Sequence, residues 1–298
     1  MGLRNVSVRP LAVVLGVVVV MTAGCGGGGG MGGRDIVIDE PVKLVRTFDE
    51  GQVVKYKLAS AGEMAVAMQG YDRVATTQTE FKTSCTFTNT DTDEVNLAMR
   101  FDYAASSIVA GDQVVSQESA AELRGKTLQV SLSPSGEVLS FSGMGGEKYF
   151  QEGIGQLALM IHGLFPVLPD EPVTVGYTWT DDMDIPDITS ATNRDFVGET
   201  TYTVTGFKEK YQIPCVEVAT VSSFEFEGRV EQNEEAWLMT GSGVSNGTLL
   251  FSIEDGLIVY GKSETTVDFE GEGSTTAGAG ASTTLSAGLK LQGTTELL

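Results

Sequence analysis

The sequence has little of several residue types on which chemistry often depends. It contains one histidine, three cysteines and only 19 Lys+Arg against 40 Asp+Glu, which gives a net charge of −21. A single histidine leaves little room for His-dependent catalytic triads or for metal sites with several His ligands. The shortage of basic residues argues against binding to nucleic-acid phosphates and against docking on anionic lipid through a basic face.

Recognisable catalytic motifs are also missing. The sequence has no Ser-x-x-Lys pair or zinc motif. Residues 243–247 and 256–263 match the Gly-x-Ser-x-Gly and phosphate-loop patterns by letter, but they lie in or beside the strands of a predicted hairpin and not at a strand–turn–helix junction. Acidic residues gather near 91–94 and 181–187, but neither cluster has the spacing of a calcium-binding EF-hand loop. The sequence suggests no partner for His162, for which we expect a packed or surface position. We therefore expect no enzyme activity, no cofactor and no metal; a hydrolase without a recognisable motif is the enzymatic alternative.

The N-terminal segment has the features of an export signal. Arg4 and Arg9 precede an apolar stretch over 11–21, which is shorter than the roughly 20 residues of a membrane-spanning helix. Residues 21–25, Met-Thr-Ala-Gly-Cys, resemble the lipobox of bacterial lipoproteins. The resemblance implies that a signal peptide is removed and that Cys25 receives a lipid. The alternative is a plain signal peptide with an incidental cysteine.

The residues after this signal predict a tethered, acidic body. Residues 1–24 form the expected signal peptide, residues 25–33 the lipidated cysteine and a glycine-rich tether, and residues 34–298 the body. Loss of the signal removes two basic residues and no acidic one, which leaves 17 basic against 40 acidic residues, a charge of −23. We expect acyl chains to hold the body on the bacterial envelope. A glycine after Cys25 favours the outer membrane, on its periplasmic face or at the surface.

The body shows the alternation of half-buried β-strands. From Val95 to Tyr103, apolar side chains fall on every second residue. Residues 127–142 predict a hairpin that turns at 133–136, and a second hairpin is predicted to turn at 254–256. The C-terminal stretch 264–298 predicts a last long hairpin with a turn of small residues.

Two parts of the body look alike. The hairpins over 127–142 and 248–260 resemble each other, and a hairpin-like pair of strands precedes each of them. We therefore expect pseudo-repeats over about 46–143 and 176–298, joined by a helical linker over about 144–175. A 3.6-residue apolar period predicts one helix over about 146–165, ending before Pro166. The expected fold is mainly β (α+β): long, curved antiparallel sheets from two related halves, half-barrel-like, with one helix.

One segment carries a resemblance to a known family. Residues 168–179, Leu-Pro-Asp-Glu-Pro-Val-Thr-Val-Gly-Tyr-Thr-Trp, resemble an element of an uncharacterised family of bacterial β-rich envelope lipoproteins. Residues 123–126 and 133–139 are similar to the middle region of that family. The resemblance implies a fold and a location and carries no activity. Long curved sheets with one helix also resemble the half-barrel lipoproteins that carry lipids across the envelope.

Two further sets of residues each have two interpretations. Cys85 and Cys215 remain once Cys25 is lipidated, and they form either a disulfide in the oxidising envelope or two separate buried thiols. Five aromatic residues either line an apolar cavity between sheet and helix or belong to the core: Phe101, Tyr103, Phe141, Phe224 and Phe226.

The sequence thus predicts a lipid-anchored envelope lipoprotein that serves as a structural or interaction protein. The alternative function is a carrier or sensor of a lipid or other apolar ligand, held between a curved sheet and the helix. The expected partners are the membrane, through the acyl chains, and either an envelope protein or the apolar ligand; nucleic acid is not one of them.

Overall fold

The computed structural model describes most of the body. The described residues are 32–68, 71–90, 94–111, 113–116, 122–143, 160–184, 194–232, 235–275 and 283–298. The expected signal peptide and Cys25 lie outside them, as does most of the expected helix. Among these residues no helix has both the length and the apolar character to cross a membrane.

Strands make up nearly all of the regular structure. In chain order they are β1 (Arg34–Asp35), β2 (Val53–Met68), β3 (Tyr71–Thr90), β4 (Val95–Ala110), β5 (Gln113–Ser116), β6 (Thr127–Leu132), β7 (Val138–Ser142), β8 (Thr178–Asp184), β9 (Arg194–Lys210), β10 (Ile213–Gln232), β11 (Glu235–Ser252), β12 (Ile258–Thr275) and β13 (Thr283–Leu297). Most are far longer than the usual five or six residues. The hairpins predicted over 127–142, around 254–256 and over 264–298 are confirmed.

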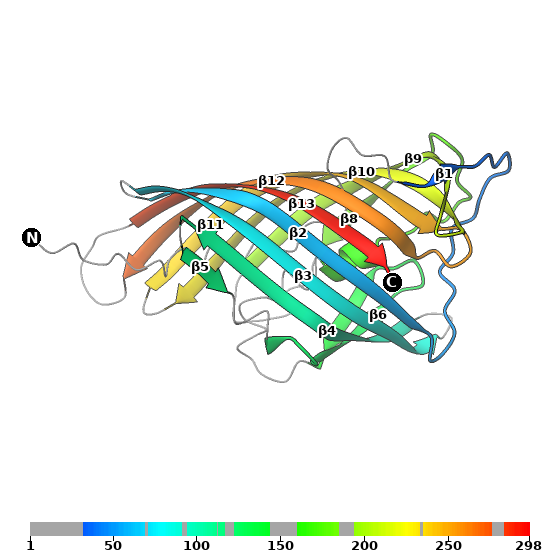
Figure 1. Cartoon of the computed structure of the whole chain (residues 1–298), viewed down its shortest axis with the longest axis horizontal. Helices are drawn as coiled ribbons and strands as arrows, with labels where there is room; N and C mark the ends of the chain where they lie inside the picture. Colours follow the sequence, from blue (N-terminus) through cyan, green and yellow to red (C-terminus); the bar gives the residue numbers. More distant parts are fainter. Residues whose placement is uncertain are drawn as a thin grey trace, which may run out of the picture.

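All these strands form one antiparallel sheet. Its order is β1-β9-β10-β11-β12-β13-β2-β3-β4-β6-β7, with β5 on β4 and β8 on β9. The last strand, β13, pairs with β2 from Leu285↔Met68 to Leu297↔Tyr56, so one sheet joins both ends of the body. Figure 1 shows this sheet curving, with β2, β3, β4 and β13 in front and β9, β10 and β11 behind. A mainly β fold with a large curved sheet is what the alternation predicted.

The two long edges of the sheet are covered by short strands. On β9, strand β8 pairs with Val197–Thr203 and β1 with Lys208 and Glu209. On β4, β6 covers the first part and β5 the last, and between them the Arg124 Nε donates to the carbonyl of Ala104 at 2.8 Å. The short outer strands leave only short stretches of unpaired backbone at these edges.

The one described helix is short. Residues 160–164 are helical, and the chain leaves the helix before Pro166, as the sequence predicts. The earlier residues of the expected helix, 146–159, lie outside the described residues. The segment over 160–168 and the extended segment over 42–48 lie against the face of the sheet that carries the core, which we call the inner face.

A β-bulge explains one wrong expectation. Strand β4 pairs Tyr103 with Lys82 and Phe101 with Thr83, which leaves Asp102 as an extra residue. The buried positions therefore change from odd numbers before the bulge to even numbers after it. Because of this change, Tyr103 lies on the outer face and is 38% exposed instead of continuing the buried row.

Candidate functional site

The inner face of the sheet has three zones along the strands. Strand β8 shows all three: Trp179 packs against one apolar cluster, Asp181 is buried next to it, and Met183 belongs to a second apolar cluster. The first cluster, with the helix, lies near the turns at 211–212 and 253–257, and we call it the capped half. The second, toward the opposite ends of the strands, is the far half. A polar zone separates them.

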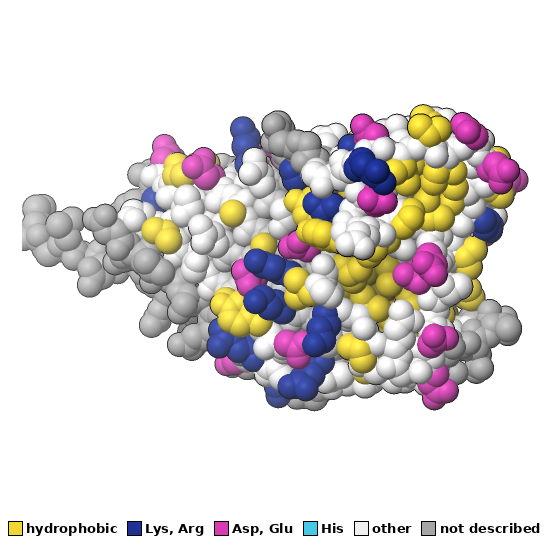
Figure 2. Space-filling view, turned by 45° about the vertical axis from the view of Figure 1, so that its right-hand side comes forward, with side chains coloured by type: hydrophobic (Ala, Val, Ile, Leu, Met, Phe, Trp, Pro, Cys, Tyr) yellow, Lys and Arg dark blue, Asp and Glu magenta, His cyan; other side chains and the backbone are white. Residues whose placement is uncertain are grey.

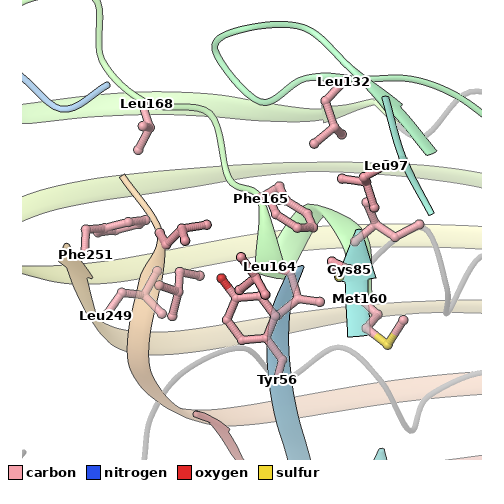
Figure 3. Packing of buried hydrophobic residues seen from close by; sticks show 14 of the residues in the cluster. Tyr56, Cys85, Leu97, Leu132, Met160, Leu164, Phe165, Leu168, Leu249 and Phe251 are labelled. Atoms are coloured by element: carbon pink, nitrogen blue, oxygen red, sulfur yellow. The ribbon is translucent and has the colours of Figure 1, made fainter. Parts of the chain in front are cut away.

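Described segments cover the capped half. Phe165, at the end of the helix, meets the rings of Tyr56 and Phe87 edge-on, with centroids 6.4 and 6.5 Å apart. Figure 3 shows Leu164 and Phe165 among side chains from the sheet, with Tyr56, Cys85 and Leu249 around them. This half is a two-layered core.

Arg46 forms hydrogen bonds to two loops of the capped half. Its Nη1 donates to the carbonyl of Ser135 at 2.6 Å, and its Nη2 donates to the carbonyl of Pro166. Burial lowers the pKa of Arg46 to about 10, although Tyr56, Tyr202 and Asp181 act in the opposite direction. The guanidinium stays charged at neutral pH and joins the 133–136 turn to the end of the helix.

The polar zone is a belt of small side chains that crosses the sheet from β8 to β4. Adjacent strands pair Asp181 with Thr200, Thr200 with Ser222, Ser222 with Ser245 and Ser245 with Thr265. A second row runs beside this one through Thr220, Ser263, Ser60, Thr79 and Ser106. We call the hydroxyl-bearing members the hydroxyl belt: Ser60, Thr77, Thr79, Ser106, Thr200, Thr220, Ser222, Ser245, Ser263 and Thr265.

Some belt hydroxyls pair with each other and some do not. Hydrogen bonds join Thr79 to Ser106 at 3.0 Å, Thr200 to Ser222 at 2.8 Å, and Thr265 to Ser245 at 2.9 Å. Thr77 Oγ1 and Ser263 Oγ are buried and have no hydrogen-bond partner in the described part of the chain. Buried hydroxyls are normally hydrogen-bonded, so these two can still accept or donate.

His162 and Asp181 close one end of the belt. The Nε2 of His162 lies 2.9 Å from Asp181 Oδ2, in a geometry that is not that of a hydrogen bond, and the backbone N–H of Val167 approaches the same oxygen at 3.4 Å. The sequence suggested no such partner. Beside this pair is a cavity of about 60 Å³, whose lining includes His162, Thr220 and Ser245. That volume suits about two water molecules or a small polar group.

The far half is apolar and is built differently from the capped half. Every described member of its cluster lies on a strand of the sheet, and no described segment forms a second layer over it. Large side chains lie across inner-facing glycines of the next strand: a Cβ on Gly273 would come within 2.8 Å of the Trp237 ring, and the Phe224 ring occupies the corresponding space at Gly243. These rings therefore lie flat on the sheet.

The outer face carries a shallow trough of about 1040 Å³ that crosses β9 to β13, β2 and β3. Small side chains such as Ala65 and Ser286 form its floor, and the acidic residues along it are Asp72, Glu225, Glu227, Asp268 and Glu270. Figure 2 shows charges of both signs over the middle of one view of the molecule and more hydrophobic side chains toward the capped end.

The predicted cavity residues do not line one cavity. Phe101 is fully buried in the capped half, whereas Phe224 and Phe226 belong to or pack against the far half. Tyr103 lies on the outer face, and the side chain of Phe141 is outside the described part of the structure. The alternative interpretation, that these aromatics belong to the core, holds for Phe101 and Phe224, because strand register and the Asp102 bulge separate the described members of the set.

The two body cysteines do not form a disulfide. Cys85 lies in the capped half on the inner face, and Cys215 belongs to a small cluster with Leu250 and Val259 on the outer face. Their strands, β3 and β10, are five steps apart in the sheet, roughly 24 Å at the usual strand spacing. The interpretation as two separate buried thiols is therefore the correct one. Burial raises the pKa of each thiol to about 12.

The residues of the family-like element 168–179 hold loops in place. Leu168 and Val173 are buried in the capped half, Val173 forms a bridge to Val42, and Trp179 Nε1 donates to the carbonyl of Val167 at 3.0 Å. Gly176 has a φ of +88°, which favours glycine. The element is structural in this chain, and membership of the lipoprotein family stays a prediction.

Comparisons with known proteins give a likeness in fold only. No protein-family model matches the chain, and no curated protein matches it. Among solved structures, a chain from a study of lipid–protein interactions in lipovitellin is similar at 12% identity and a TM-score of 0.48, over 85% of this chain and 25% of that one. This chain thus spans about a quarter of the lipovitellin chain.

Two weaker likenesses have lower scores. DynF from the dynemicin biosynthesis pathway of Micromonospora chersina has 8% identity and a TM-score of 0.17, over 90% of this chain and 92% of that one. A DUF1329 family protein from Desulfovibrio piger has 10% identity and a TM-score of 0.15, over 81% and 85%. At these scores none of the three structures bears on the function.

Proposed function

We propose that the protein is a lipid-anchored protein of the bacterial envelope that holds an apolar molecule against the far half of its inner face. The observation that supports this most is the construction of that half. In the described part of the chain its apolar side chains, each at most 7% exposed, all come from strands of the sheet, with Trp237 and Phe224 flat over glycines, whereas helix and loop segments form a second layer over the capped half.

The dimensions suit a lipid chain. Along β11 the inner face runs from Ser245 in the belt to Trp237, about 27 Å at the rise of an extended strand. One leaflet of a bilayer's hydrocarbon core is about 15 Å thick, so an acyl chain fits along this length. Methionines Met64, Met183 and Met239 are part of the lining, and their flexible side chains adapt to ligands of varied shape.

The test compares two substitutions on neighbouring residues of β13. Ala287 faces inward in the far half, and Ser286 is exposed on the outer face. The Cys25→Ser form, which cannot be acylated, is exported, purified and extracted with organic solvent, and the extract is examined by mass spectrometry. We expect an apolar molecule from the parent chain and from Ser286→Trp, and little from Ala287→Trp. Empty extracts from all three would contradict the proposal.

A structural or interaction role is the second candidate function, and the outer trough favours it. The trough is large and is lined by five acidic side chains and one basic side chain, Arg73, so a basic segment of an envelope protein is the complementary partner. Cross-linking in the native envelope from a position in the trough, such as Ser242, would test it. Capture of the same protein from Ser242 and from an outer-face position beyond the trough would argue against a specific site.

A further inference from the structure

We infer that the bound molecule is amphipathic, with an uncharged, hydrogen-bonding head of the acylglycerol kind that lies on the hydroxyl belt while its chain lies along the far half. This inference rests on the proposed function and specifies the ligand class.

Two buried hydroxyls without a hydrogen-bond partner in the described part of the chain indicate a hydrogen-bonding ligand head. Thr77 Oγ1 and Ser263 Oγ are buried on the inner face, the two residues being 2% and 0% exposed, and neither has a partner among the described residues. Leaving a buried hydroxyl without a partner costs about 1–3 kcal/mol. Ser263 pairs with Gly247, between Ser245 and Leu249 of β11, so a ligand head with hydroxyl and ester oxygens near these residues would supply its missing partner. Thr77 is on β3, three strands further across the sheet.

The cavity beside His162 limits the size and the polarity of the head group. Its lining combines the belt residues Thr200, Thr220, Ser222 and Ser245 with the far-half residues Met183, Phe196 and Phe224. A group placed there therefore touches hydroxyls on one side and apolar side chains on the other. Its volume of about 60 Å³ admits a small polar group and is too small for a sugar or a choline head.

The charges around the belt indicate an uncharged ligand head. None of the belt residues is Lys or Arg, and Asp181, at the end of the belt, brings a carboxylate that faces His162. Arg46 interacts with Asp181, but it already donates to the carbonyls of Ser135 and Pro166. A phosphate or carboxylate head would therefore lie buried beside Asp181 with no cation among the belt residues, which is costly. The belt therefore favours an uncharged head over an anionic one.

The experiment measures displacement of diphenylhexatriene, an uncharged apolar fluorophore, from the full chain carrying Cys25→Ser. The competitors are monopalmitoylglycerol, palmitate and hexadecane, which share a chain length and differ in the head. We expect monopalmitoylglycerol to displace the fluorophore at a concentration about 10-fold lower than hexadecane or palmitate, as one or two good hydrogen bonds imply.

Three variants test which hydroxyl contacts the ligand head. Ser263→Ala and Thr77→Val remove the unpartnered hydroxyls, and Thr266→Val removes an exposed threonine on the outer face of β12. We expect Ser263→Ala to weaken the binding of monopalmitoylglycerol about 3- to 10-fold and to leave that of hexadecane unchanged. Thr77→Val, three strands away, and Thr266→Val should change the binding of neither competitor. Without ligand, Ser263→Ala should be as stable as the parent chain or more so.

The outcomes separate the two proposals. Failure of the fluorophore and of every competitor to bind would contradict both the proposed function and this inference. Equal displacement by all three competitors, or tighter binding of palmitate, would leave the apolar site standing and overturn the uncharged head. A loss of ligand-free stability in Ser263→Ala would show that its hydroxyl serves the fold, and would also overturn the inference.

Discussion

The capped half and the far half lie on the same strands and are both apolar, yet they are packed differently. In the capped half, the helix, Arg46 and the extended segment over 42–48 form a second layer over the sheet. In the far half, glycines let aromatic rings lie flat, and the described residues belong to the sheet alone. Both halves are buried, so they differ in what packs on the strands: a second layer in the capped half, and side chains of the sheet itself in the described part of the far half.

The largest expected effect comes from equal truncations in the two halves. Leu249→Ala removes a side chain packed under the second layer of the capped half, and we expect a loss of about 3–5 kcal/mol in the free energy of unfolding. Leu289→Ala, which is fully buried in the far half, should cost about 2 kcal/mol because its cross-strand neighbour Met64 is flexible and can move into the space left. Denaturant unfolding of both variants checks this, and equal losses would remove the distinction between the halves.

The next effect concerns Arg46. Arg46→Met leaves the carbonyls of Ser135 and Pro166 without their charged donor, and we expect a loss of about 2–3 kcal/mol. Arg46→Lys is the control, because an ammonium cannot serve two carbonyls in the planar geometry of a guanidinium and should recover only part of the loss. Full stability in Arg46→Met would show that the loops of the capped half are held in another way.

Alkaline pH should destabilise the capped half. Burial raises the pKa of Cys85 to about 12 and also raises the pKa of Tyr56 and Tyr202. The unfolded chain loses these protons at lower pH than the folded chain, so the stability they contribute is present below pH 9 and falls as the pH rises toward 12. Unfolding measured on both sides of pH 9 should show this decline, and Cys85→Ala should flatten it. An unchanged slope in that variant would exclude Cys85 as a cause.

The thiols provide a related, simpler observation. Both body cysteines are buried and free, so a thiol reagent at neutral pH should label neither in the folded Cys25→Ser chain and both after unfolding. No label after unfolding without reductant would mean that the cysteines are oxidised.

The smallest expected effect lies on the outer face. Lys208 and Glu217 form an ion pair at 3.0 Å that raises the pKa of Lys208. Because such pairs are screened by water and salt, Glu217→Gln should change the stability by less than about 1 kcal/mol, and less again in high salt. A larger loss of stability would mean that charges on the outer face, and not only the packing on the inner face, stabilise the capped end of the sheet.

The strands and hairpins could be predicted because their signals are local. Alternation over 95–103 and the turns at 133–136 and 254–256 each lie within one hairpin. The pairing of β13 with β2 has no local signal, and the Asp102 bulge reverses the face of Tyr103 without any break in the apolar pattern. The sequence therefore predicted the strands better than their register.

The hydroxyl belt was missed for a related reason. In β2 the inward residues change from Tyr56 and Leu58 to Ser60 and Gly62 and back to Met64. Within one strand such a change looks like a weak place in the alternation. Its meaning depends on the register, which places the same change at the same height in neighbouring strands. The partner of His162 was hidden in the same way, because Asp181 reaches it only through the pairing of β8 with β9.

The central claim is that an apolar chain lies on the far half and not on the capped half, and the two tryptophans of the chain report on the two halves separately. Trp237 lies in the far half, whereas Trp179 packs against Tyr202 in the capped half, with centroids 4.9 Å apart. The measurement is fluorescence quenching by a brominated-chain monoacylglycerol in Trp179→Phe, with Trp237→Phe as the matched control. We expect saturable quenching of Trp237 and almost none of Trp179. No quenching of Trp237, or equal quenching of both tryptophans, would contradict the claim.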